Sequence, residues 1–130
     1  MEVSNNTDCQ TLLIITSLPD EASAQTLATT LVAERLAACV SVLAPCRSTY
    51  RWQGTIESAA EIPLLIKTTT ARYAALEDAI RARHPYELPE IIAVPIAHGL
   101  PEYLAWVVTE TRTGTCAETH VEHTTGDSSK

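Results

Sequence analysis

The stretch TLLIITSLPDEASAQTLATTLVAERL, residues 11–36, carries the first strand and the first helix of the predicted fold. It opens with TLLIIT, a nearly continuous apolar run rich in β-branched side chains, which predicts a buried strand. Pro19 breaks that run, and Asp20 is a good N-cap for the element that follows. Apolar side chains then recur at helical spacing as far as Leu36, which predicts an amphipathic helix of roughly four to five turns.

The next part of the chain, residues 39–68, predicts one extended β-hairpin with an irregularity near Pro45. Side chains alternate between apolar and polar over residues 48–53, and Gly54 is a turn signal. Pro63 cannot donate to a sheet ladder, so we expect it at an edge or a bulge.

The last elements complete an α+β pattern. A second helix begins at Thr70 as its cap and ends before Pro85, residues 91–96 predict a fourth core strand, and Pro101 begins a short helix through Thr111. This order predicts a ferredoxin-like βαββαβ sandwich with a long β-hairpin and an extra C-terminal helix.

One face of such a sheet has no helix packed on it. An apolar face cannot stay in contact with water, so something must cover it. The final helix can cover part of it, and a neighbouring subunit is the simplest cover for the rest. We therefore predict an oligomer.

Length and composition set the broad class. A chain of 130 residues predicts one domain, here residues 11–112, between disordered tails at residues 1–10 and 113–130. The net charge of −7 argues against a nucleic-acid or anionic-membrane surface. No apolar run approaches the ~20 residues of a membrane helix, and residues 1–10 do not resemble a secretory signal. We expect a cytoplasmic protein.

The cysteines fall at irregular spacings, so we expect free thiols, with Cys39 and Cys46 as small buried hydrophobic residues. In the C-terminal tail, Cys116, His120 and His123 could wrap a copper or zinc ion. The alternative is an ordinary polar tail.

Six segments, in this order along the chain, resemble the CutA family of divalent-cation tolerance proteins: LPDEASAQTLA, ERLAACVSVL, STYRWQG, LLIKTT, HPYELPEI and YLAWV. The resemblance runs from about residue 12 to residue 112. It implies a ferredoxin-like subunit in a tight trimer, with the hairpin arms pairing across subunits. It also implies copper or another divalent cation as the ligand, and no catalysed reaction. The trimeric build is similar to that of the nitrogen-regulatory PII proteins, which bind small molecules between subunits, but fold alone does not decide function.

The resemblance also implies a metal site made of a thiol, a glutamate and a histidine. Glu61 matches the glutamate, whereas Thr16 stands in place of the thiol and Arg83 in place of the histidine. We therefore expect no tight copper site, but a weak, exchangeable one that uses Glu61 and His84. In the alternative interpretation, His84 ends the helix, where a partly positive ring suits the last carbonyl groups.

A second candidate site is a cleft between subunits, lined by aromatic and charged side chains: Tyr50, Trp52, Lys67, Tyr86 and Glu90. It would bind a small anionic metabolite in a signalling module. Alternatively, the aromatic residues pack a subunit interface, Lys67 pairs with a glutamate, and the trimer is a platform for another protein. The sequence contains no Ser–His–Asp order, Gly-rich phosphate loop or CxxC pair, so we do not expect an enzyme.

Overall fold

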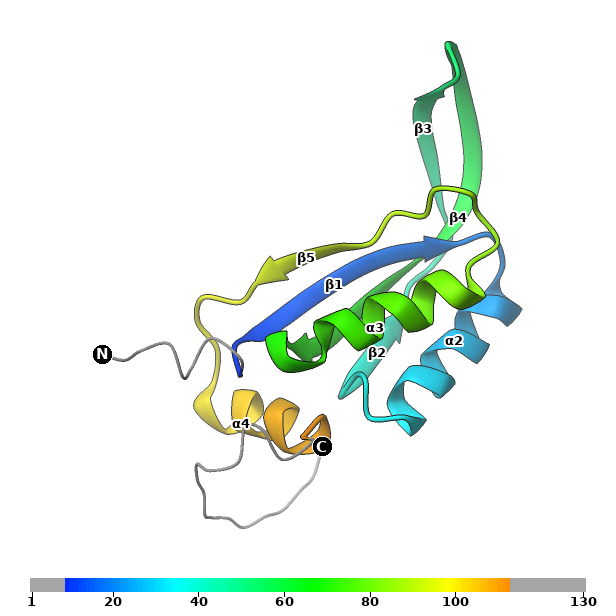
Figure 1. Ribbon diagram of the computed structural model, residues 1–130. Coiled ribbons are helices and arrows are strands. Elements are labelled where there is room, and N and C mark those ends of the chain that lie inside the picture. The colour runs from blue at the N-terminus through cyan, green and yellow to red at the C-terminus, as the bar shows by residue number, and fades with distance from the viewer. Residues whose placement is uncertain (1–8, 113–130) are drawn as a thin grey trace.

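The structure is a computed structural model, and it describes residues 9–112. The predicted tails therefore lie outside the described residues, apart from residues 9 and 10. The described part is a mixed α+β fold, as predicted (Figure 1). Its strands and helices follow in the order β1 (Thr11–Leu18), α2 (Glu21–Ala33), β2 (Cys39–Val42), β3 (Cys46–Trp52), β4 (Thr55–Thr69), α3 (Thr70–Arg83), β5 (Ile92–Pro95) and α4 (Pro101–Glu110).

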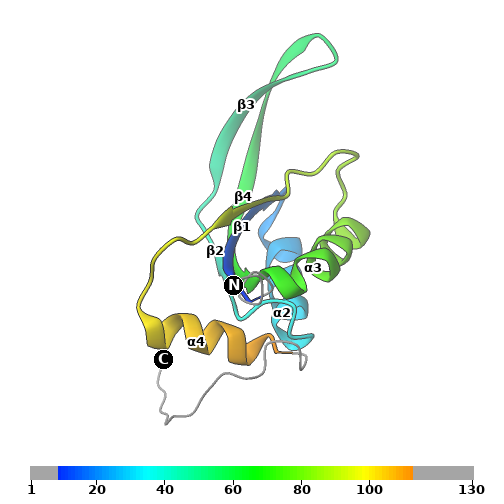
Figure 2. The same ribbon diagram turned by 60° about the vertical axis from the view of Figure 1, so that its left-hand side comes forward.

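The strands pair antiparallel in the order β2–β4–β1–β5, and β3 pairs with a further part of β4. β4 belongs to two regions. Residues 62–69 pair with β1 inside the sheet, while residues 55–61 pair with β3. The β3–β4 pair consequently projects from the rest of the molecule as an arm, which Figures 1 and 2 show from two sides.

The irregularity predicted near Pro45 is the break between β2 and β3. The same break accommodates Pro63, which lies in β4 where the partner strand changes from β2 to β3. The N–H of Leu43 donates to the Pro63 carbonyl over 2.9 Å, so this part of β4 keeps a backbone partner at the break. A proline is tolerated there because the regular ladder is already interrupted.

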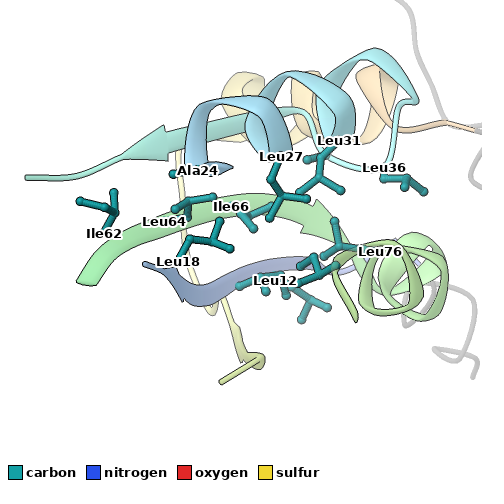
Figure 3. Close-up of a cluster of buried hydrophobic side chains, with 13 residues drawn as sticks. Leu12, Leu18, Ala24, Leu27, Leu31, Leu36, Ile62, Leu64, Ile66 and Leu76 are labelled. Carbon is teal, nitrogen blue, oxygen red and sulfur yellow. The ribbon is translucent and has the colours of Figure 1, made fainter. Parts of the chain in front are cut away.

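The core lies between the sheet and helices α2 and α3, which cover the same side of the sheet (Figure 2). Along β4, Ile62, Leu64 and Ile66 point to that side and are buried, as period-2 alternation requires. Leu27 and Leu31 of α2 face them across the core (Figure 3). Each such side chain contributes about 1.5–3 kcal/mol by leaving water.

The helix ends depart from the predictions by small amounts. Asp20 caps α2 as predicted, accepting from the Ser23 N–H over 2.8 Å. This helix ends at Ala33, before the predicted Leu36, because Arg35 adopts a left-handed φ of 59°.

Two other helix boundaries shift by one residue. Thr69, not Thr70, is the N-cap of α3. Thr111 is the C-cap of α4 and not its last helical residue.

The other side of the sheet is more open. The alternate β4 residues, such as Leu65 and Lys67, are only half-buried. The predicted fourth strand is present as β5, but Ile92 and Val94 are 47% and 43% exposed, so within one subunit this strand does not belong to the core. β5 is an edge strand that pairs with β1 alone, and the helices α2 and α3 cover the opposite side. α4 packs against β1 and β4, with Val107 fully buried.

Candidate functional site

The candidate site lies where α3 ends and the chain turns back towards β5, close to the base of the arm. Pro85 forces the residue before it out of the helical region, so α3 ends at Arg83. His84 is the C-cap, with φ −82° and ψ 134°. This extended conformation takes the chain out of the helix.

Both ring nitrogens of His84 have hydrogen-bond partners. Nε2 lies 2.6 Å from the carbonyl oxygen of Ser17, and the backbone N–H of Tyr86 donates to Nδ1 over 3.2 Å. Because Nδ1 accepts a hydrogen bond, Nε2 must carry the proton and donate to Ser17, which assigns a neutral ring. His84 thus joins the end of β1 to the loop after α3.

Tyr86 lies between His84 and Glu61. Its ring centroid is 4.8 Å from that of His84. Burial raises the pKa of the Tyr86 phenol, and a hydrogen bond to Glu61 with the negative charge of that carboxylate raises it further. The nearby Tyr50 contributes in the same direction. Glu61, Tyr86 and His84 therefore form one cluster.

The arm supplies the carboxylate side of this cluster. In the β3–β4 register, Glu61 lies opposite Cys46 and Glu57 lies opposite Tyr50. Since side chains alternate between faces, these four residues share one face of the arm. Tyr86 approaches that face at its base.

The remaining residues of the predicted cleft do not join the cluster within one subunit. Trp52 lies at the tip of the arm, opposite Thr55, and Glu90 is exposed. Lys67 follows Glu61 by six residues in β4, a distance of about 20 Å at the rise of an extended strand. A cleft containing all five residues would have to include a second subunit.

The two residues that replace the family's other ligands point elsewhere. Thr16 is fully buried on the helix-covered side of β1, and its hydroxyl has no hydrogen-bond partner. Arg83 donates from Nη1 to the Ala79 carbonyl over 3.1 Å, and its Nη2 lies 3.9 Å from a carboxylate oxygen of Glu34. The interaction with helix carbonyls that we considered for His84 is made by Arg83 instead.

The donor groups of the described residues do not form a ready-made metal centre. Residues 9–112 contain no group of three or more His, Cys, Asp or Glu side chains placed to hold a metal ion. Glu61 and His84 could together supply two ligands, and water would complete the coordination. The tail residues Cys116, His120 and His123 lie outside the described residues.

The cysteine predictions need two corrections. Cys46 is exposed, because it lies on the arm and not in the core, whereas Cys39 is half-buried. Cys9 is disulfide-bonded, so the expectation of free thiols is wrong for this residue. Spacing along the chain carries no information about which thiols meet in space.

One contact of the site could not be found in the sequence. The acceptor for His84 is the backbone carbonyl of Ser17. Every residue has such a carbonyl, so the type of residue at position 17 gives no signal for this contact. Only the pairing of β1 and the direction of α3 bring the two residues together.

The fold and the site define a class: a small α+β protein with an imidazole and a carboxylate at the base of a hairpin arm. Within that class, the family of CutA1 divalent ion tolerance proteins matches residues 12–110, and the chain belongs to this family. The resemblance of the six segments is thereby confirmed.

Two curated relatives are close in sequence. The divalent-cation tolerance protein CutA of Thermus thermophilus is 46% identical over 95 residues, covering 73% of this chain and 92% of the relative. The protein of the same name from Salmonella newport is 39% identical over 98 residues, covering 75% and 85%.

Solved structures agree with the fold. The crystal structure of CutA from Xylella fastidiosa is 50% identical, with a TM-score of 0.77, and covers 79% of this chain and 99% of that one. The periplasmic divalent cation tolerance protein CutA of Archaeoglobus fulgidus is 34% identical, with a TM-score of 0.76 over 78% and 99%. None of the helices in residues 9–112 is both long and apolar enough to cross a membrane.

Proposed function

We propose that this protein binds a divalent cation such as copper, weakly and reversibly, as part of the cell's tolerance to metal ions. Membership of the divalent ion tolerance family supports the general role. The observation that supports the proposal is that Tyr86 neighbours both residues, with its phenol towards the Glu61 carboxylate and its backbone N–H donating to the His84 imidazole.

The ligand types favour a borderline metal ion. Imidazole suits copper and zinc, and a carboxylate oxygen adds negative charge without imposing one geometry. Two protein ligands leave several positions to water, so affinity stays low and exchange is fast. Such a site would buffer or sense a cation without holding it permanently.

The working unit that we propose is a homotrimer of ferredoxin-like subunits. The strand order β2–β4–β1–β5, with two helices on one side, supports the ferredoxin-like arrangement. The exposed Ile92 and Val94 and the half-buried Leu65 support a subunit contact on the other side. In this arrangement the projecting arms would pair with neighbouring subunits.

We propose binding without a catalysed reaction, in the cytoplasm. The raised pKa of the Tyr86 phenol means that this group keeps its proton more firmly than an ordinary tyrosine. An activated nucleophile would need the opposite shift. The relative from Archaeoglobus fulgidus is described as periplasmic, so the compartment is to be tested by fractionation of cells.

The second candidate function is binding of a small anionic metabolite between subunits. Lys67 favours it, because this cation is half-buried on the side of the sheet away from α2 and α3. In this version the trimer acts as a regulatory module similar to the PII proteins, without a metal role. Titration with citrate and inorganic phosphate, on the protein and on Lys67→Gln, tests it. Binding that the substitution removes would favour this function.

Calorimetric titration of the full chain with copper(II) tests the metal proposal. A background carrying Cys9→Ser, Cys116→Ser, His120→Ala and His123→Ala removes competing ligands outside the fold's body.

In that background, Glu61→Gln and His84→Ala should each weaken binding about tenfold, as loss of one charged or imidazole ligand predicts. Glu57→Gln, on the same face of the arm, is the matched control and should change nothing. Binding that disappears with the background itself would place the site in the tail. Absence of binding in every variant, the natural chain included, would rule out direct metal binding.

A further inference from the structure

We propose that a second site, in a cleft between the end of α2 and the helix α4, binds a small apolar α-amino acid. The cleft has a volume of about 290 Å³. Its lining combines apolar side chains with one cation and one carboxylate: Val32, Ala37, Ala38, Trp106, Arg35 and Glu110. A binding pocket for a small molecule has this composition, mostly apolar with a few polar groups that orient the ligand.

This cleft is remote from the candidate metal site. The N–H of Ala38 donates to the Lys67 carbonyl over 2.9 Å, and Lys67 pairs with Leu13 near the start of β1. Ser17, which His84 contacts, lies near the other end of the same strand. The inference therefore does not rest on the proposed metal function.

Arg35 presents donors that a carboxylate can use. Its Nη1 donates to the backbone carbonyl of Glu110 over 3.0 Å and lies 3.6 Å from Oε1 of the same residue. The guanidinium has further N–H groups on Nε and Nη2, and these have no hydrogen-bond partner within residues 9–112. A planar guanidinium binds both oxygens of a carboxylate at once. Arg35 can therefore bind the carboxylate of the ligand and keep its contact with Glu110.

The backbone holds Arg35 in a conformation that glycine adopts more easily. Its φ of 59° is left-handed, and a helix end of this kind usually has glycine at that position. The N–H of Arg35 donates to the Val32 carbonyl over 3.0 Å, and its carbonyl accepts from Arg72 Nε over 3.2 Å. Non-glycine residues held in such conformations are concentrated at functional sites. An arginine at this turn supports a use for its side chain.

Glu110 selects an amino acid over a plain carboxylic acid. Its Oε2 has no partner in the part of the chain that the structure describes, so this oxygen can accept from an ammonium group. An α-amino acid carries its ammonium and carboxylate groups on one carbon, which suits a carboxylate and a guanidinium placed side by side. A ligand without the ammonium group would bring a second negative charge to Glu110 without compensation.

The apolar part of the lining would hold the side chain of the ligand. Ala37 and Ala38 are buried, and Val32 is 43% exposed. The Trp106 ring adds aromatic surface, and its centroid lies 5.5 Å from that of Tyr103. The volume is near the lower end of the range of about 300–1,000 Å³ for small-molecule pockets, so the cleft suits a ligand of amino-acid size.

The fluorescence of Trp106 can report binding directly. Trp52 and Trp106 are the two tryptophans of the chain, so Trp52→Phe leaves Trp106 as the only indole. Titration of this variant with L-leucine should change the emission of Trp106 in a saturable way. Isocaproate lacks the ammonium group and isoamylamine lacks the carboxylate, and each should bind about tenfold more weakly than L-leucine.

Substitutions of the two charged residues test their roles. Arg35→Gly keeps the left-handed turn and removes the guanidinium, and it should weaken L-leucine binding about tenfold or more. Glu110→Gln should weaken it about tenfold, because a neutral amide pairs poorly with an ammonium group. Arg112→Gln and Glu102→Gln are the matched controls, since both residues are exposed and lie outside the lining of the cleft.

Calorimetric titration of the natural chain with L-leucine is the second measurement, and it needs no variant. No saturable signal in either measurement up to about 10 mM L-leucine would overturn the inference. Equal binding of isocaproate and L-leucine would overturn the assignment of an amino acid, even if Arg35→Gly fails to fold. Copper is absent from all these titrations, so their outcome is independent of the metal proposal.

Discussion

His84 and Ser17 are 67 residues apart in the chain, yet the Nε2 atom of His84 lies 2.6 Å from the Ser17 carbonyl oxygen. This contact fastens the end of α3 to the end of β1. The ring that could serve as a metal ligand is therefore also a structural tie. Its two roles can be separated by measuring stability and metal binding on the same variants.

His84→Ala should lower the free energy of unfolding by about 1–2 kcal/mol, because it removes one hydrogen bond and leaves the carbonyl of the buried Ser17 without this donor. Urea unfolding at a fixed protein concentration measures it, since an oligomer's stability depends on concentration. His98→Ala is the control. His98 is exposed in the loop before α4, and its substitution should change stability by less than about 0.5 kcal/mol. Equal effects of the two substitutions would contradict the structural role.

Thr16→Val should stabilise the protein by about 1 kcal/mol, because the buried hydroxyl of Thr16 has no hydrogen-bond partner and valine has nearly the same shape. Thr68→Val is the control, and it should change the free energy of unfolding in the opposite direction. The Thr68 hydroxyl donates to the Leu36 carbonyl over 2.7 Å and is equally buried, so its loss should destabilise by about 1 kcal/mol. Thermal and urea unfolding of both variants check the pair. Destabilisation by Thr16→Val would indicate an unseen partner for that hydroxyl.

Alkaline pH should weaken the fold through Tyr86. Its folded pKa is raised above the ordinary value of 10.0, chiefly by burial and then by Glu61. Above about pH 10, the unfolded chain releases the phenol proton while the folded chain still holds it. The resulting stability is complete below that pH and is lost as the pH rises towards the folded pKa.

Absorbance titration of the tyrosines near 295 nm checks this prediction. Glu61→Gln should lower the pKa of Tyr86 towards its ordinary value but not fully restore it, because burial is the largest cause of the shift. Tyr73, whose pKa is raised by burial and Glu77, should be unaffected by Glu61→Gln. A substitution that leaves the Tyr86 titration unchanged would contradict the contact.

Val94→Glu should dissociate the proposed trimer, because it buries a charge in the subunit contact on the open side of the sheet. Val32→Glu is the matched control, since both valines are 43% exposed and Val32 lies on α2, across the sheet. Sedimentation velocity or light scattering measures the mass of each variant. A trimer that survives Val94→Glu would place the subunit contact elsewhere.

The main elements could be predicted from local patterns. Asp20 as a helix cap and Pro85 as the end of α3 follow from their own backbone chemistry. The predictions differ from the structure at positions whose conformation or burial depends on residues distant in the chain. Arg35 ends α2 early by turning left-handed, and residues 91–96 look like a core strand because their apolar character does not show which side of the sheet is covered.

The candidate site divides in the same way. Glu61 matches a glutamate that the family resemblance implies, and His84 is the imidazole next to Arg83, which replaces the implied histidine. The structure places Glu61 and His84 beside Tyr86, whereas Lys67 and Trp52 lie apart from them. Their use as metal ligands stays a prediction. Distances between strands cannot be read from spacing along the chain, since a strand and a returning loop meet only after the sheet has formed.

By itself the sequence determined the α+β class, the order of strands and helices and the break at Pro45, because propensity, periodicity and proline chemistry act over a few residues. The family followed separately, from the resemblance of six segments. Only the tertiary structure decided that the single free lone pair of His84 faces the Tyr86 N–H and that the Glu61 carboxylate faces the same residue. Those contacts join β1, the arm and the loop after α3. They depend on how elements distant in the chain pack together, and packing of that kind leaves no local pattern in the sequence.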